Sequence, residues 1–287
     1  MSERTYEEIE TENEKLRQDN AELSARVKQN KIPYPTNSTT DISQYFSGRE
    51  LTIGVVSDSH LGSIHARPDI LSHMYEIFKE KGISTVLHTG DMVAGVSVYP
   101  GQVHELTHHT YEAQKNHAIK KYPLVEGIRT LVIAGNHDTS FMRRPDGGDI
   151  VKAICKERED MEYLGMIEAD VKLAHKVKVR MRHPSGGPAY ALSYKLQRGV
   201  AAMEGGAKPQ IMLEGHYHSA VFMNIRNINA LLVPCTESQS LYLKAKNLEP
   251  VMGGWILDMG LAKDGSIIRF APELLKFYQR RYWQKTG

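Results

Sequence analysis

The chain contains one short run that combines an amide, an imidazole and a carboxylate, Gly135-Asn136-His137-Asp138. A folding core does not call for such a group, whereas metal binding and proton transfer both use these side chains. The run follows the apolar segment 128–134, which predicts a buried strand ending just before it. The tetrad is therefore a candidate for functional chemistry at the end of a strand.

Four other strand-like segments lead into residues of the same kind. They are 51–57, 83–89, 176–182 and 210–214, and each is either apolar or alternates apolar with polar residues. In open α/β sheets, ligands bind beyond the carboxyl ends of the strands, so we expect the side chains at these ends to meet. The candidate side chains at these ends are Asp58, His60, Asp91, His183, His216 and His218.

Taken in order, these motifs resemble those of the calcineurin-like metallophosphoesterases. The motifs are Asp-x-His, Gly-Asp, Gly-Asn-His-Asp, a lone His and Gly-His-x-His, within roughly residues 51–270. Each piece alone is common, but five in order at strand ends are specific. The resemblance is closest to the diesterase and nuclease branches. It implies an α/β (α+β) fold, a sandwich of two mixed sheets flanked by helices.

The resemblance also implies two divalent metal ions, with hydroxide bridging them and attacking the phosphorus of a phosphodiester. Oxygen and imidazole ligands without thiolates suit Mn²⁺ first, with Fe, Ni or Zn²⁺ as alternatives. His137 would act as general acid or transition-state stabiliser, with Asp138 orienting it. One ion would be held by Asp58, His60, Asp91 and His218, and the other by Asp91, Asn136, His183 and His216, with Asp91 as the bridge.

Two basic features bear on the substrate. Arg143 and Arg144 stand close enough to the tetrad to reach a bound phosphate, or are solvated loop charges. The strand 176–182 has Lys or Arg at every second position, which predicts either a solvated face or a face that tracks a phosphate backbone. Nucleic acid is one candidate substrate. A small-molecule or nucleotide phosphatase or phosphodiesterase is the alternative.

Two readings from other classes are also open. His104 and His108 belong to a His-Glu-x-x-His run, the zincin pattern, which opens a predicted helix extending to Lys121. No third ligand follows at metzincin spacing, and the run lies inside the larger constellation of motifs. The other reading is a coiled-coil adaptor without catalytic activity, although all the expected metal ligands are present.

The N-terminal segment predicts a coiled coil over residues 1–31. Two Asn at position a favour a parallel pair of helices, hence a homodimer, and a single solvated helix is the alternative. Residues 32–48 contain two prolines and many small polar residues and predict a linker, so the catalytic domain is expected over 49–287. The heptad has Tyr6, Asn13, Asn20 and Val27 at position a and Ile9, Leu16 and Leu23 at position d.

Composition adds limits on class and location. With 287 residues and 41% hydrophobic content, the chain can bury a large core. A net charge of +2 does not decide for or against nucleic acid, and two widely separated cysteines argue against a disulfide framework. We expect no membrane span, because no apolar run approaches about 18 residues. Cytoplasmic residence is the corresponding expectation.

Overall fold

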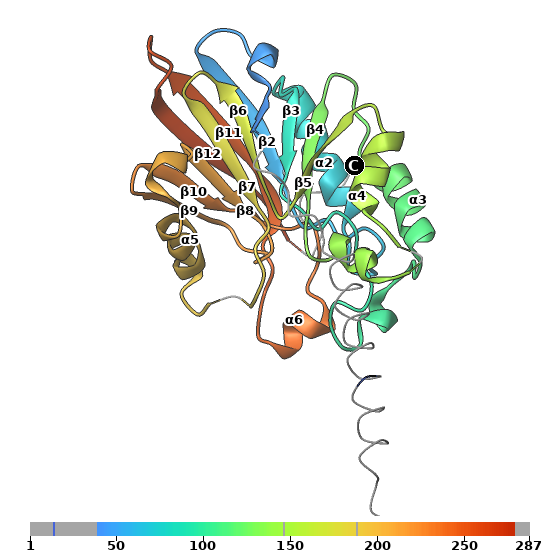
Figure 1. The fold of residues 1–287 in the computed structure, drawn as a ribbon. Helices are drawn as coiled ribbons and strands as arrows, with labels where there is room; N and C mark the ends of the chain where they lie inside the picture. The colour runs from blue at the N-terminus through green and yellow to red at the C-terminus, as the bar shows by residue number, and fades with distance from the viewer. Residues whose placement is uncertain (1–13, 15–38, 146, 188, 279–287) are drawn as a thin grey trace, which may run out of the picture. The chain divides into compact units, whose positions relative to one another are not determined.

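The structure is a computed structural model that describes residues 14, 39–145, 147–187 and 189–278 (Figure 1). The chain divides into two units, 1–34 and 35–287, and all described residues except Glu14 belong to the second. The predicted coiled coil over 1–31, and the dimer expected from it, therefore lie outside the described residues apart from Glu14.

The first sheet has the strand order β12-β11-β2-β3-β4-β5. β2, β3, β4 and β5 run parallel, and β11 pairs antiparallel with both β2 and β12. The strands are β2 (Glu50–Val56), β3 (Thr85–His88), β4 (Arg129–Ala134), β5 (Met161–Met166), β11 (Met252–Leu261) and β12 (Ile267–Phe277).

The second sheet has the order β1-β6-β7-β8-β10-β9. β7, β8 and β10 are parallel, whereas β6 and β9 run antiparallel to their neighbours β7 and β10. The five strands predicted to end in functional residues are thus present in the two sheets as β2, β3, β4, β7 and β8. The strands of the second sheet are β1 (Thr39–Asp41), β6 (Glu168–Ala174), β7 (Val177–Arg182), β8 (Ile211–Glu214), β9 (Val221–Ile225) and β10 (Ile228–Leu232).

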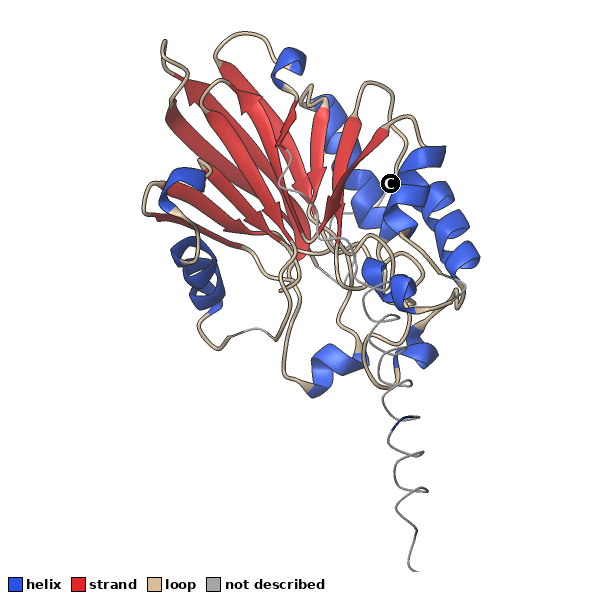
Figure 2. Cartoon of the chain, viewed as in Figure 1, coloured by secondary structure: helices blue, strands red, loops and turns tan. Residues whose placement is uncertain are grey.

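The two sheets pack face to face with helices outside them (Figure 2), so the predicted sandwich is confirmed. The core between the sheets is aliphatic and includes Ile53, Leu131, Val179 and Leu213. α2 and α4 cover the first sheet, α3 packs on α4, and α5 covers β9 and β10. The helices are α2 (Pro68–Glu80), α3 (Tyr111–Lys121), α4 (Ile150–Glu157), α5 (Leu192–Ala201) and α6 (Leu241–Ala245), with 3-10 turns η1 (Ser43–Tyr45), η2 (Gln102–Glu105), η3 (Asp138–Arg143) and η4 (Gly205–Ala207).

α2 shows how the sequence produces this packing. Pro68 occupies the first turn, where its missing N–H costs nothing, and Gly82 lies just beyond the end. Met74 and Phe78 are four residues apart, so both project from one face and are fully buried. The Phe78 ring lies against Gly54 of β2, where a Cβ would be 2.9 Å from the ring. Glycine at that position therefore sets how closely the helix approaches the sheet.

The folded domain begins earlier than predicted. Residues 32–48 were expected to be a linker, but β1 pairs in parallel with β6 through Thr39–Asp41. Ile42 follows β1 and is 1% exposed, packed in the core between the sheets. The polar composition of this segment gives no sign of a strand, because β1 forms only by pairing with the distant β6. Within the described residues, no helix has the length and apolarity needed to cross a membrane.

Candidate metal centre

The loops that follow five strands meet at one end of the sandwich (Figure 1). Three strands of the first sheet and two of the second contribute, as the carboxyl ends of parallel strands share an edge. Asp58 and His60 follow β2, Asp91 follows β3, Asn136 and His137 follow β4, His183 follows β7, and His216 and His218 follow β8.

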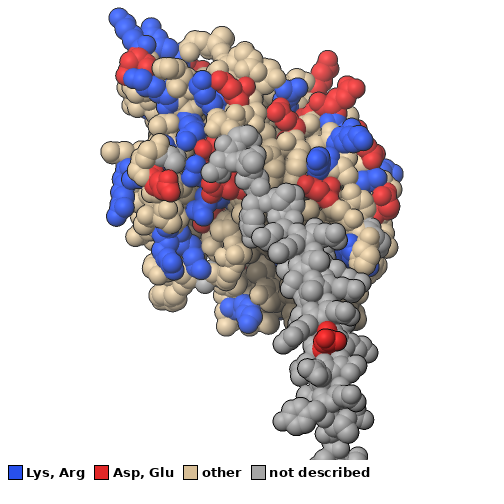
Figure 3. Space-filling model, in the orientation of Figure 1, with Lys and Arg blue, Asp and Glu red and all other residues tan. Residues whose placement is uncertain are grey.

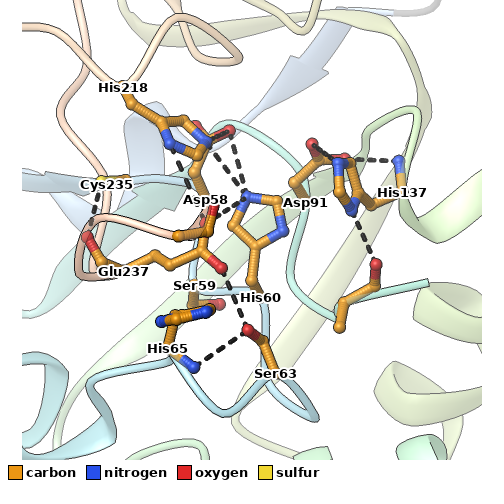
Figure 4. A network of polar contacts seen from close by, with 12 residues as sticks. Asp58, Ser59, His60, Ser63, His65, Asp91, His137, His218, Cys235 and Glu237 are labelled. Atoms are coloured by element: carbon orange, nitrogen blue, oxygen red, sulfur yellow. Dashed lines mark hydrogen bonds and ion pairs between the residues drawn. The ribbon is translucent and has the colours of Figure 1, made fainter. Parts of the chain in front are cut away.

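Asp58, His60 and His218 form a first cluster of side chains that fits a metal ion (Figure 4). The Nε2 atoms of His60 and His218 are 3.1 Å apart, and His218 Nε2 is 3.2 Å from Asp58 Oδ1. Ligand atoms bound at about 2.1 Å from one ion lie roughly 3.0 to 3.4 Å from one another. Two imidazole nitrogens that face each other beside a carboxylate are therefore spaced as ligands of a shared cation.

Asp91, His183 and His216 form a second cluster, which Asn136 joins. His183 Nε2 lies 3.0 Å from Asp91 Oδ2 and 3.2 Å from the Asn136 side-chain oxygen. Asp91 also groups with His60 and His137, so it lies between the two clusters. The structure thus brings together the seven residues predicted as ligands, and Asp91 groups with residues of both clusters.

Hydrogen bonds from outside the clusters hold these ligands in place. His183 Nδ1 donates to the carbonyl oxygen of Thr89 at 2.8 Å, which orients the ring so that Nε2 points toward Asp91 and is the nitrogen available to a metal. The backbone N–H of His216 donates to the Asp58 carboxylate at 3.0 Å, and the hydroxyl of Ser57 donates to it as well. The orientations of the His183 ring and of the Asp58 carboxylate are therefore fixed by the protein itself.

The clusters attract positive charge. Burial alone would lower the pKa of His183, but the charge of Asp91 and the hydrogen bond to it raise this pKa to about 9. For the acid Asp91, burial acts in the opposite direction and would raise the pKa. The charge of His183 nevertheless keeps the pKa of Asp91 below its ordinary value. A buried carboxylate that stabilises a neighbouring proton so strongly would also stabilise a metal cation.

The backbone is strained at the ligands. Five of them adopt positive φ, a region that residues other than glycine rarely occupy, at a cost on the order of 1 to 3 kcal/mol each. Such strain collects at functional sites because the surrounding structure fixes the backbone there. The residues are Asp58 (49°), His60 (43°), Asp91 (55°), His216 (76°) and His218 (49°).

Gly135 is required by the close packing of the second cluster. A Cβ at this position would collide with the carboxylate of Asp91 and lie 2.8 Å from the His183 ring. The first residue of the central tetrad therefore gives the other ligands room.

His137 lies beside the bridge position, and its support differs from the one predicted. Its Nδ1 donates to the carbonyl oxygen of Ala94 at 2.6 Å, and its Nε2 is 4.0 Å from Asp91 Oδ2. Burial lowers the pKa of His137 to about 4. The prediction that Asp138 orients His137 holds only indirectly, because the Asp138 carboxylate accepts the N–H groups of Val93 and Gly135. It fixes the loop that carries Ala94.

Burial and then the charge of Asp91 raise the pKa of Asp138 to about 7. Burial and the charge of Asp91 therefore favour the protonated form of the Asp138 carboxyl, whereas its backbone hydrogen bonds favour the charged form. Among the described residues, the Asp138 carboxylate accepts hydrogen bonds from the backbone N–H groups of Met92, Val93 and Gly135, and it thereby holds the loops on either side of His137 in place.

The basic face of β7 is paired with acids. The antiparallel register places Asp170 opposite Arg180 and Glu168 opposite Arg182. On the face shown in Figure 3, Lys and Arg are likewise interspersed with Asp and Glu. Because these cations are paired with acids, the strand no longer favours the interpretation of a face that tracks a phosphate backbone. The pairs are Lys176 with Asp264, Lys178 with Asp170, Arg180 with Asp170 and Glu168, and Arg182 with Glu168 and Glu214.

The zincin interpretation is wrong in its structural premise. His104 and Glu105 lie in η2, and the helix that ends at Lys121 begins only at Tyr111, so the two histidines do not share a helical face. Glu105 is 5% exposed and accepts hydrogen bonds from the Tyr99 hydroxyl and the backbone N–H of Leu241. It joins the segment after β3 to the start of α6.

Sequence reasoning missed Glu237, a buried carboxylate beside the first cluster. It follows β10 in a stretch, Cys-Thr-Glu-Ser, that has no recognisable ligand pattern. The predicted phosphate-binding residues Arg143 and Arg144 are exposed at the end of η3.

Comparison with known proteins shows the family to which this domain is similar. Residues 51–235 match the family model described as the calcineurin-like phosphoesterase superfamily domain. The DNA polymerase II small subunit of Halobacterium salinarum (strain ATCC 29341 / DSM 671 / R1) is 26% identical over 253 residues, which cover 74% of this chain and 49% of that protein. The same-named protein of strain ATCC 700922 / JCM 11081 / NRC-1 matches equally. The chain thus spans about half the length of the curated relatives it matches.

Solved structures of low sequence identity are also similar. A novel archaeal phosphodiesterase is 17% identical, with a TM-score of 0.44 over 78% of this chain and 100% of that one. Wild-type Vps29 of Entamoeba histolytica complexed with zinc is 16% identical, with a TM-score of 0.39 over 79% of this chain and 100% of that one.

Proposed function

The chain belongs to the calcineurin-like phosphoesterase superfamily, and we propose that it is a phosphodiesterase that uses two divalent metal ions. The observation that carries this proposal is that Asp91 lies in the second ligand cluster and also groups with His60 of the first. The ligand set of carboxylate, amide and imidazole favours Mn²⁺, with Fe, Ni or Zn²⁺ as alternatives. The metal ligands we propose are Asp58, His60, Asp91, Asn136, His183, His216 and His218.

Divalent cations bound here would neutralise phosphate oxygens and activate water for in-line attack on phosphorus. The chain's own part is to fix the geometry. His137 is held through Nδ1, which leaves Nε2 directed at the space beside Asp91. Because burial keeps the ring neutral and its one proton is on Nδ1, Nε2 would first have to take up a proton, which the negative charge of a bound phosphodiester would favour, before passing it to the leaving oxygen. Asp138 would serve by keeping the Ala94 loop, and hence the ring, in place.

Nucleic acid is a second candidate for the substrate. Its support is the relative named DNA polymerase II small subunit, which this chain covers only in part. The paired cations of β7 do not add to it. Arg143 and Arg144 are exposed and are our proposed contacts for phosphate groups beyond the scissile one.

A panel of esters tests the proposal. The purified protein with Mn²⁺ should hydrolyse bis-p-nitrophenyl phosphate faster than p-nitrophenyl phosphate. His137→Ala should slow hydrolysis by about 10²- to 10⁴-fold for diesters with poor leaving groups, and less for nitrophenyl esters, because a good leaving group needs little proton transfer. Hydrolysis of monoesters alone would contradict the phosphodiesterase assignment, and an equal effect on all leaving groups would contradict the role of His137.

A further inference from the structure

Glu237 is a buried carboxylate with a fixed backbone. It is 6% exposed and forms an isolated β-bridge with Ala66, and its carbonyl oxygen accepts the Cys235 thiol at 3.4 Å. Its neighbour Ser238 donates its backbone N–H to the carbonyl of His65 at 2.9 Å. The side chain is therefore held in one direction by the backbone on both sides.

That direction is toward the first cluster (Figure 4). Glu237 Oε2 lies 3.8 Å from His60 Nε2 and 4.0 Å from His218 Nδ1. Its other oxygen, Oε1, accepts a hydrogen bond from the Ser63 hydroxyl at 3.1 Å. Among the described residues, the ion-pair contacts recorded for this carboxylate are with these two histidines and with no Lys or Arg.

A buried carboxylate without a cationic partner is costly, so its position needs a compensating positive charge nearby. His218 shows a complementary need. Its Nε2 faces Asp58, while its Nδ1 is buried and has no hydrogen-bond partner within the described part of the chain. A histidine that binds a metal through one ring nitrogen usually donates the other N–H to a carboxylate or carbonyl oxygen. Glu237 Oε2 is the carboxylate oxygen at 4.0 Å from that nitrogen.

We infer that Glu237 is a positioning residue for the metal ion of the first cluster, an inference that rests on the function proposed above. At 4.0 Å its carboxylate acts on His218 Nδ1 through its charge, which favours the ring form that is protonated at Nδ1 and presents Nε2 to the metal, and it places a further negative charge beside the cation.

This makes the two clusters unequal. Besides the shared Asp91, the first cluster has the carboxylates of Asp58 and Glu237, whereas the second has the neutral amide of Asn136. The first cluster therefore binds a divalent cation more tightly than the second.

Glu237→Gln tests this role, because it keeps the size and the hydrogen bond from Ser63 but removes the charge. Manganese binding to the metal-depleted full-length chain is measured by isothermal titration calorimetry. We expect one of two binding events to weaken by about 10- to 100-fold, with the other changed by less than about threefold. The matched control is Glu105→Gln, which removes an equally buried carboxylate that contacts Tyr99, Leu241 and His65, none of them a proposed metal ligand. It should leave both affinities unchanged.

The weakened event is assigned in a His216→Ala background, which removes one imidazole of the second cluster and should leave the first cluster as the tighter site. Adding Glu237→Gln there should lower the remaining affinity by the same factor. Thermal unfolding of the metal-free proteins separates positioning from a folding defect, and Glu237→Asp, which keeps the charge, should retain affinity closer to wild type than Gln does.

If a folded Glu237→Gln variant bound both manganese ions as tightly as the wild type does, the inference would be overturned while the proposed function stayed intact. A wild-type protein that binds no pair of ions would instead overturn the proposed function itself.

Discussion

Replacing Lys176, Lys178 and Arg180 together by Gln tests whether the basic face of β7 contacts a nucleic acid. If all three contacted phosphates, the slope of log affinity against log salt would flatten by about 2 to 3, at roughly 0.7 to 0.9 per contact. In the structure each of these cations already lies within 3.2 Å of an Asp carboxylate. A cation that a carboxylate already neutralises releases few counterions from a nucleic acid, so we expect the slope to change by less than about 0.5.

The same variant should lose stability. The side chains of Arg180 and Asp170 are 10% and 11% exposed and share two hydrogen bonds, at 2.7 and 2.9 Å. Leaving that carboxylate short of its partner should lower the free energy of unfolding by about 1 to 3 kcal/mol, measured by urea titration. Hydrolysis of bis-p-nitrophenyl phosphate should not change, because these side chains are not among the metal ligands.

Salt-dependent binding to a single-stranded oligonucleotide is the assay. Arg143→Gln with Arg144→Gln is the comparison, since these exposed charges should flatten the slope by about 1.4 to 1.8 if both contact phosphates. A triple variant of β7 whose slope falls by about 2 would refute the pairing argument and restore the basic strand as a phosphate-binding face.

Two further predictions concern the histidines of the zincin pattern and the N-terminal residues. His104→Ala should keep phosphoester hydrolysis within about threefold of wild type, whereas His216→Ala should remove it; a peptidase activity lost with His104→Ala would instead restore the zincin interpretation. Deleting residues 1–31 should leave a folded, active domain. Deleting 1–48 also removes β1 and the buried Ile42, so it should lower the free energy of unfolding by about 2 kcal/mol or more. Equal stability of the two truncations in urea titrations would show that β1 is dispensable, and a dimer mass that survives the shorter deletion would place the interface in the domain.

The site was predictable where the signal is local. Each buried strand is readable from its apolar run, and parallel strands bring their carboxyl ends together, so Asp58, Asp91 and His183 could be placed at one edge without coordinates. The chemistry of the side chains then indicated metal binding. Strand periodicity and residue type placed these side chains at strand ends, whereas the division of the ligands between two metal ions was what the resemblance to the calcineurin-like metallophosphoesterases implied.

The parts that were missed depend on contacts between distant segments. Glu237 contacts His60 across more than 170 residues, and no local pattern marks it. The basic strand was read without its partner, because only the antiparallel register places Asp170 opposite Arg180. The three residues of β1 are polar and form a strand because β6 offers an edge. Local periodicity carries no information about such partners.

Counting bound metal in wild type and in Asp91→Ala tests the central claim most directly. The wild-type chain should bind two divalent ions and hydrolyse bis-p-nitrophenyl phosphate. Asp91 belongs to the second cluster and also groups with His60 of the first, so its loss should remove at least one ion and abolish hydrolysis. Two fully occupied sites with undiminished hydrolysis in Asp91→Ala, measured by elemental analysis and by nitrophenol release, would contradict the dinuclear account.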